Sequence, residues 1–249
     1  MQQTASQPSS AEALLEANRH YYDSLWSGAR LVEPQQFNTW PLIQSLLPSC
    51  TARLEIAPGL RPRLPLEGTQ FVDVSGPAVA KLREHGASAA VGLVDALPFA
   101  DATFDLVCAL DIVEHVDDDA AAFAEIVRVA KANAIILISV PLHPELWNAF
   151  DDFVGHRRRY APEPLAAILR DHGLKVERSA VFGMQPKSSR LLDLGMWWLT
   201  HHRERALWWY NKVFMPIGLK AQKKLELTEG LLDIAKIDEV LMVCRRGPR

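Results

Sequence analysis

Residues 87–116 constrain the fold of this chain more than any other stretch of its sequence. They read ASAAVGLVDALPFADATFDLVCALDIVEHV, in which two apolar runs, 89–94 and 104–110, each lead into an acid, Asp95 and Asp111. Short apolar runs bounded by turn residues are typical of buried strands. Because the carboxyl ends of parallel strands meet at one edge of a sheet, the two acids predict a polar-ligand site at that edge.

The rest of the chain alternates between strand-like and helix-like patterns, which predicts an α/β fold with a mostly parallel sheet covered on both faces. Ser75 is expected to cap a helix that Gly86 ends. The further strands expected are 52–57, 69–75, 134–140, 174–183 and 239–245, and two helices, 11–28 and 34–48, are expected ahead of the sheet.

Composition narrows the function classes. The 249 residues carry a formal net charge of -3, which gives no reason to expect a nucleic-acid partner. The three cysteines lack metal-ligand spacing and are expected to be buried thiols, which suits a reducing cytoplasm. Residues 1–10 are polar and are expected to form a disordered leader without a secretion signal. No metal site is predicted.

The loop after the first strand, LEIAPGLRP, indicates the kind of cofactor. A nicotinamide-binding loop needs three glycines followed by a helix, whereas here Gly59 stands alone and the next strand follows closely. Glycine lets the backbone approach a ligand, so Arg61 in place of one is a departure, and Ala57 costs little if its φ is negative. A nicotinamide oxidoreductase is therefore disfavoured.

The segment VDALPFADATFDLVCALDIVEHV resembles the one that follows the cofactor loop in class I, Rossmann-like S-adenosylmethionine-dependent methyltransferases. The resemblance implies a seven-stranded sheet with an antiparallel last strand, and S-adenosyl-L-methionine as the methyl donor. It implies a degenerate form of the family's glycine loop, with Asp73 bonding the ribose and Asp95 the adenine. Each acid also has a simpler structural alternative. Asp73 would cap a helix, Asp95 would be a residue of a turn, and Asp111 would lie in the first turn of a helix. The implied donor-binding residues are Glu55, Ala57, Gly59, Asp73, Val74, Asp95, Ala96, Asp111 and Ile112.

A later segment, GHRRRY at 155–160, resembles the G-H-x-R-R-Y-like loop of a bacterial branch of these enzymes. His156 and His115 are the candidate catalytic bases, and neighbouring arginines are expected to lower the pKa of His156. The arginines are alternatively structural partners of Asp151 and Asp152. Candidate substrate-binding residues are Tyr21, Tyr22, Arg159 and Tyr160.

Residues 185–236 lie where the family has a tight hairpin, and they contain Trp197, Trp198, Trp208 and Trp209. From 187 to 224 there are eight cations and two acids. Aromatic and basic helices favour peripheral membrane contact, here through 190–224, but no window is apolar enough to span. The alternatives are a helical lid over the active site or a homodimer contact.

These observations predict one methyltransferase domain over 1–249, with a leader (1–10), helical cover (11–50), Rossmann-like core (51–184), helical insert (185–236) and last strand with tail (237–249). The expected enzyme transfers a methyl group in line to a small-molecule or lipid-like acceptor, in the cytoplasm or at the inner membrane surface. The alternative is a catalytically lapsed methyltransferase fold that acts by binding.

Overall fold

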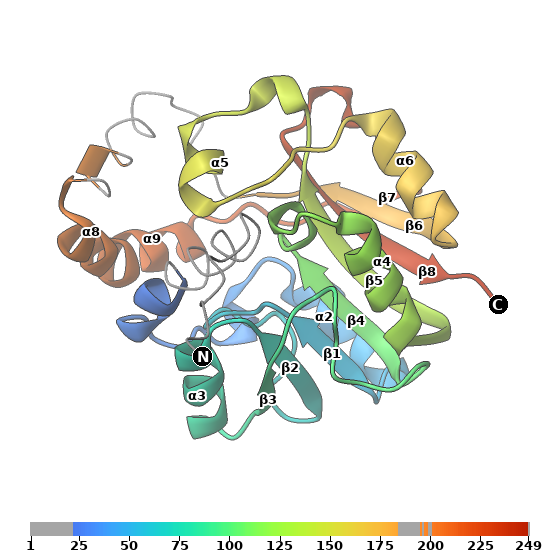
Figure 1. Cartoon of the computed structure of the whole chain (residues 1–249), viewed down its shortest axis with the longest axis horizontal. Helices are drawn as coiled ribbons and strands as arrows, with labels where there is room; N and C mark the ends of the chain where they lie inside the picture. The colour runs from blue at the N-terminus through green and yellow to red at the C-terminus, as the bar shows by residue number, and fades with distance from the viewer. Residues whose placement is uncertain (1–21, 184–194, 196, 199–200, 249) are drawn as a thin grey trace, which may run out of the picture.

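In the computed structural model, the described residues are 22–183, 195, 197–198 and 201–248. They form one eight-stranded sheet in the order β3-β2-β1-β4-β5-β8-β6-β7 (Figure 1). The strands are β1 Arg53–Ile56, β2 Thr69–Asp73, β3 Ser88–Val91, β4 Phe104–Leu110, β5 Ala130–Pro141, β6 Leu174–Val181, β7 Thr228–Glu229 and β8 Glu239–Arg246.

Strand directions agree with the prediction. The neighbours from β3 to β5 pair in parallel, and β8 runs antiparallel to both β5 and β6. All seven predicted strands are present. The eighth, β7, pairs antiparallel with β6 at the sheet edge, and its two residues are too short for a periodic pattern to reveal.

The two faces of the sheet are covered by different helices, because neighbouring strand residues point to opposite sides. Val107 and Ala109 of β4 pack with α4 Asp119–Val129 and α6 Pro162–Asp171. Leu106 and Cys108 face α2 Trp40–Leu46 instead. Helix α3 Gly76–Glu84 packs with Phe71 of β2 and with Leu25 and Trp26. Ser75 caps α3, as predicted, by accepting a hydrogen bond from the Ala78 amide.

The helical cover is less regular than predicted. Residues 22–27 are helical, while the leader and the remainder of 11–21 lie outside the described residues. The expected helix 34–48 is divided into η1 Pro34–Gln36, α2 and η2 Leu47–Ser49. A proline occupies the first or second position of each piece, because proline begins a helix easily but breaks one from within.

The insert is helical only in its first part. Helix α8 Arg203–Trp209, the π-helix η5 Tyr210–Phe214 and α9 Met215–Lys220 run consecutively. The helical prediction is wrong beyond residue 220, where the chain extends into β7 and the short η6 Ile234–Lys236. Leu225 and Leu227 alternate with polar residues there and pack against the α2 side of the core, which is a strand-like pattern.

Three shorter elements complete the carboxyl side of the sheet: η3 Val113–His115, η4 Pro144–Leu146 and α5 Ala149–Val154. Gly155 ends α5 with a left-handed φ of 81°, so the chain turns back toward β4 immediately before His156. None of the described helices combines the length and hydropathy that a bilayer crossing requires.

Candidate functional site at the carboxyl edge of the sheet

Asp73 is the last residue of β2 and links this strand to the glycine loop. Its Oδ2 accepts a hydrogen bond from the Gly59 amide at 2.8 Å, and its Oδ1 accepts one from the Ser75 amide at 2.8 Å. Burial raises the pKa of Asp73 to about 6, although both hydrogen bonds oppose the shift. Each carboxylate oxygen keeps a second lone pair, so Asp73 can also accept a ligand hydroxyl.

Glu55 lies within β1 and points into the face covered by α2 and α3. Its carboxylate accepts hydrogen bonds from the Arg63 amide at 2.8 and 3.0 Å and from the Leu64 amide at 2.8 Å. Burial raises its pKa to about 7. Glu55 therefore holds the segment that follows the glycine loop and does not face the edge where a ligand would bind.

The glycine loop itself is closed by an aromatic ring. A methyl group placed on Gly59 would lie 2.1 Å from Cζ2 of Trp26, so the indole occupies the close approach that glycine provides. The Arg61 guanidinium lies 5.1 Å from the Trp26 ring centre and donates a hydrogen bond to the Tyr210 hydroxyl at 3.0 Å. Ala57 has a φ of 54°, not a negative one, so alanine here adopts a conformation that favours glycine.

The other two edge acids are open to solvent. Asp95 and Ala96 are exposed in the turn after β3, and Val74 is half-buried beside Asp73. Asp111 is exposed at the end of β4, where its left-handed φ of 51° aims the chain toward β5. The Ser139 hydroxyl donates to Asp111 Oδ1, and the Asp111 amide donates to Ser139 Oγ at 2.9 Å. Ile112 packs partly against the core.

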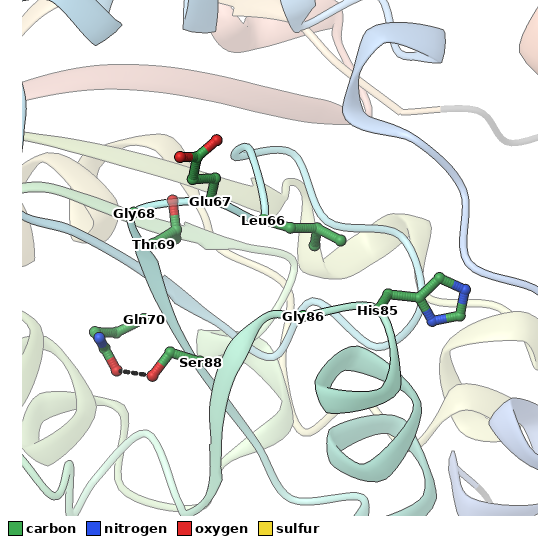
Figure 2. Close-up of a pocket in the computed structure, with 8 residues that line it drawn as sticks. All are labelled: Leu66, Glu67, Gly68, Thr69, Gln70, His85, Gly86 and Ser88. Atoms are coloured by element: carbon green, nitrogen blue, oxygen red, sulfur yellow. Dashed lines mark hydrogen bonds between the residues drawn. The ribbon is translucent and has the colours of Figure 1, made fainter.

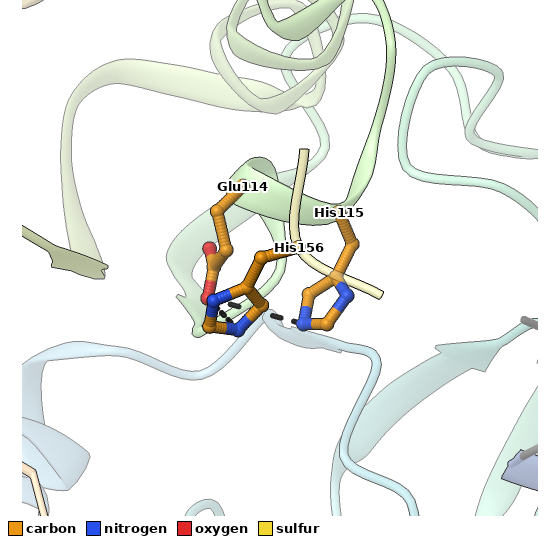
Figure 3. A group of neighbouring side chains, drawn as sticks. All are labelled: Glu114, His115 and His156. Atoms are coloured by element: carbon orange, nitrogen blue, oxygen red, sulfur yellow. Dashed lines mark ion pairs between the residues drawn. The ribbon is translucent and has the colours of Figure 1, made fainter. Parts of the chain in front are cut away.

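The two candidate catalytic histidines come together although 41 positions separate them in the sequence. The His115 and His156 ring centres are 4.7 Å apart at 80° (Figure 3). The Arg157 amide donates to the Glu114 carbonyl at 2.7 Å, which joins the two segments. Burial lowers the pKa of His115 to about 3. The pKa of His156 is lowered as expected, but chiefly by burial, and Asp151 opposes the shift.

Glu114 is the residue of this site that the sequence reasoning missed. Its carboxylate is fully buried beside the two rings, with Oε1 3.8 Å from His156 Nε2 and 4.0 Å from His115 Nε2. Neither oxygen has a hydrogen-bond partner among the described residues. Burial, with Asp111 as the next contribution, raises the pKa of Glu114 well above its ordinary value. The only signal in the sequence was its place directly before His115.

The structure does not support Arg159 and Tyr160 as substrate contacts, because both are buried and paired internally. Arg159 binds Asp151 at 2.9 Å and the Leu142 carbonyl at 3.2 Å. The Tyr160 hydroxyl donates to Asp119 Oδ2 at 2.9 Å. The structural alternative for the arginines is therefore correct only for Arg159 and Asp151. Arg157 and Arg158 pair instead with Asp117 at 3.3 Å and Asp119 at 2.7 Å, and Asp152 accepts a hydrogen bond from the Trp147 indole.

Of the two tyrosines predicted to bind substrate, Tyr21 lies outside the described residues. The Tyr22 hydroxyl is 3.5 Å from His115 Nε2 and 3.5 Å from the Val154 carbonyl. The helical cover therefore reaches the histidine pair directly.

A cavity of about 340 Å³ lies elsewhere, at the amino-terminal ends of β2 and β3 (Figure 2). It is lined by Thr69, Gln70, Gly86 and Ser88 among others, and only His85 and Glu67 of its lining residues can titrate. Parallel α/β sheets bind ligands at the carboxyl ends of their strands. This cavity is at the opposite edge of the sheet and is therefore not the candidate ligand site.

The insert presents an apolar and basic surface, which we call the aromatic patch: Trp197, Trp208, Trp209, Phe214 and Ile217. Each of the five side chains is at least 42% exposed, and the Trp208 and Trp209 ring centres are 5.5 Å apart. Four lysines beside them are also exposed: Lys212, Lys220, Lys223 and Lys224.

Residues 67–138 match the model of a family described as a methyltransferase domain. The match runs from just before β2 into β5, so it contains three edge acids and the Glu114–His115 pair. No curated protein matches the sequence.

Solved structures with similar folds extend over nearly the whole chain. A SAM-dependent methyltransferase from Thermotoga maritima has a TM-score of 0.57 at 15% identity, covering 94% of this chain and 99% of its own. A phosphoethanolamine N-methyltransferase from Haemonchus contortus, bound to S-adenosylhomocysteine, has a TM-score of 0.57 at 17% identity and covers 97% and 61%. The cyclase SpnF has a TM-score of 0.55 at 14% identity and covers 98% of each chain. The chain thus has the class I methyltransferase fold.

Proposed function

We propose that this protein is an S-adenosylmethionine-dependent methyltransferase that acts on a small-molecule or lipid-like acceptor. The observation that carries the proposal is the arrangement of Asp73, Asp95 and Asp111 at three strand ends on one sheet edge, within the range that matches the methyltransferase domain. We further propose that GHRRRY places the chain in the bacterial branch with that loop.

On the donor side, the exposed carboxylates of Asp95 and Asp111 and the free lone pairs of Asp73 suit the hydroxyl and amine groups of the donor. Val74, Ala96 and Ile112 supply neighbouring surface. The glycine loop fits only after Trp26 leaves the face of Gly59. When bound, the donor's sulfonium makes its methyl group electrophilic, and alignment by these residues provides most of the rate enhancement.

On the acceptor side we place His115, His156 and Tyr22. Burial lowers the pKa of both histidines, so each ring is neutral near neutral pH and keeps a lone pair on one of its two nitrogens. Lone pairs of this kind act on an acceptor that must lose a proton before methyl transfer. Arg159 and Asp151 keep His156 in position.

The aromatic patch supports the lipid-like class of acceptor. Exposed tryptophans beside lysines are typical of elements that lie in the interface of an anionic membrane. We propose peripheral contact with the inner membrane surface from the cytoplasm. A lid over the acceptor or a contact between two copies remains the alternative role of the patch.

The acceptor side is tested by His156→Gln. We expect turnover with labelled donor and a panel of hydroxyl and amine acceptors to fall roughly 10²–10⁴-fold, with donor affinity unchanged. His85→Gln, an exposed histidine at the opposite sheet edge, is the matched control. Normal turnover in the His156 variant would remove this residue from the chemistry.

A lapsed methyltransferase fold is the second candidate, and two observations favour it. Trp26 covers the only glycine of the loop, and both oxygens of Asp73 already accept backbone hydrogen bonds. The cyclase SpnF shares the fold, so the fold alone does not fix the reaction. Absence of donor binding decides for this candidate.

A further inference from the structure

We infer that Glu114, His115 and His156 form a binding site for a divalent transition-metal ion at the carboxyl edge of the sheet. Each of the three residues offers one ligand atom, and these atoms all lie within 4.8 Å of one another (Figure 3). Two of the residues come from η3 and the third from the loop after α5, so the fold itself builds the cluster.

The donor set is the first argument. Two imidazoles and one carboxylate are the protein ligands of many catalytic zinc and non-haem iron sites, in which one or more positions remain open for water or substrate. The Tyr22 hydroxyl lies beside this cluster, 3.5 Å from His115 Nε2. A coordination position of the ion that stays open for water or substrate would therefore lie next to the helical cover.

The distances are the second argument. Tetrahedral zinc with ligand bonds of about 2.0–2.2 Å holds its donor atoms roughly 3.3 Å apart. The two histidine nitrogens lie 3.8 and 4.0 Å from Glu114 Oε1. Ion binding would draw the three ligand atoms, which lie within 4.8 Å of one another, closer together by rotation of the side chains. The same distances are too long for hydrogen bonds, so a shared proton does not explain why the groups converge.

The third argument is the way His156 is held. Its Nδ1 is 2.8 Å from Asp151 Oδ1, and a carboxylate partner there fixes the proton on Nδ1 and leaves the lone pair on Nε2, the nitrogen that faces Glu114. Arg159 and the Asn148 amide fix Asp151 in turn, both at 2.9 Å. Metal-binding histidines nearly always have such a carboxylate or carbonyl behind them.

Glu114 supplies the fourth argument. A fully buried carboxylate with no hydrogen-bond partner for either oxygen is costly for a folded protein. Asp111 and Asp151 add further negative charge nearby. A divalent cation between Glu114 and the neutral histidines would remove both costs at once.

Binding of the ion does not depend on the proposed function. The role that we give the ion in catalysis does rest on the proposed function. If the protein transfers methyl groups, the ion would bind an oxygen or nitrogen atom of the acceptor and so replace a lone histidine as the group that activates it. The ion site and donor binding can therefore fail separately.

The test is calorimetric titration of Zn²⁺ into full-length protein that has been stripped with a chelator. We expect one high-affinity ion per chain and a rise in melting temperature. Co²⁺ should give the intense visible absorption of a site with histidine ligands and low coordination number. Glu114→Gln and His156→Gln should each weaken Zn²⁺ binding more than about 100-fold, and Asp151→Asn, which does not touch the ion, about 10–100-fold.

Controls separate the site from surface histidines. His201 and His202 are adjacent and exposed, so the double variant His201→Gln/His202→Gln removes adventitious binding and should keep the high-affinity ion. Glu114→Gln removes a buried carboxylate, so the metal-free variant should melt no lower than the metal-free wild type. A folded Glu114→Gln variant that binds Zn²⁺ like the wild type would overturn the inference, as would a wild type that binds none. Titration of S-adenosylhomocysteine into the same samples reports separately on the proposed function.

Discussion

At the scale of single residues, the acids of the predicted donor site divide into two kinds. Glu55 and Asp73 are buried and accept backbone amides, Asp73 from the glycine loop and Glu55 from the segment that follows it. Asp95 and Asp111 are instead exposed at the edge. A sequence shows that an acid follows a strand but not whether its oxygens face amides or solvent. Asp73 thus has a structural role in the folded chain, and the ligand-binding role that we propose for it would use the same carboxylate.

Burial of Glu55 predicts a pH dependence of stability. Its pKa is about 7 in the folded chain and 4.5 without burial, so folding favours the protonated form. The stability it contributes is fully present below the lower value and is lost as the pH rises through the higher one. Between about pH 5 and pH 8, wild type should lose about 2 kcal/mol of unfolding free energy relative to Glu55→Gln.

Chemical denaturation at both pH values measures this difference. Glu67→Gln, which changes an exposed acid, is the control and should follow the wild type. Arg63 and Cys108 face Glu55 and are unchanged in the comparison. Parallel curves for wild type and Glu55→Gln would show that Glu55 stays ionised in the folded chain.

Several residue-level expectations follow from local chemistry alone, and these are confirmed. Ser75 caps α3, and the three cysteines are buried and free. Trp26 and Glu114 could not be predicted, since their roles depend on which distant segments pack against them.

At the scale of elements, the helical cover, the glycine loop and the insert meet at one contact. Arg61 lies between the Trp26 and Tyr210 rings, at 5.1 and 5.0 Å from their centres. Lys81 of α3 holds the cover by donating to the carbonyls of Trp26, Ser27 and Ala29. A movement of the insert is therefore coupled to the glycine loop, which we propose contacts the donor.

This contact predicts the effect of Trp26→Leu. Removing the indole frees the face of Gly59, so S-adenosylhomocysteine should bind about tenfold more tightly, although the fold should lose about 2–4 kcal/mol. Trp40→Leu, which alters a tryptophan packed on the α2 side of the core, is the control and should lower stability without tightening the ligand. Weaker binding in Trp26→Leu would mean that the ring itself contacts the donor.

Element types were predictable where a periodic pattern was long enough. The seven main strands and helices α3, α4 and α6 follow from alternating or helical spacing of apolar residues. The division of the helical cover was not predictable, because its apolar pattern is that of one helix, whereas Pro34, Pro41 and Pro48 divide it into three pieces. Beyond residue 220, cation-rich composition concealed the two-residue alternation of Leu225 and Leu227.

At the scale of the whole molecule, one sheet edge carries both the acids and the histidine cluster, and the exposed aromatic patch belongs to the insert. Helices α8 and α9 of the insert lie beside the sheet, on the side away from α6 (Figure 1). Trp197→Ala combined with Trp208→Ala should abolish binding to anionic vesicles in a sedimentation assay and leave donor affinity unchanged, because both side chains are more than half exposed.

The control for that double variant is Trp147→Ala, which removes an exposed tryptophan that lies outside the insert. Unchanged vesicle binding, or none in the wild type, would favour a lid or a contact between two copies. Analytical ultracentrifugation of wild type and double variant then separates these two.

We propose above all that the carboxyl edge binds the methyl donor, and calorimetric titration of S-adenosylhomocysteine into the wild type and Trp26→Leu measures this binding. We expect one site per chain with an affinity in the range of metabolite sites, roughly 1 μM–1 mM, and tighter binding in the variant. No heat and no thermal shift in either protein would contradict it and leave a methyltransferase fold without its donor.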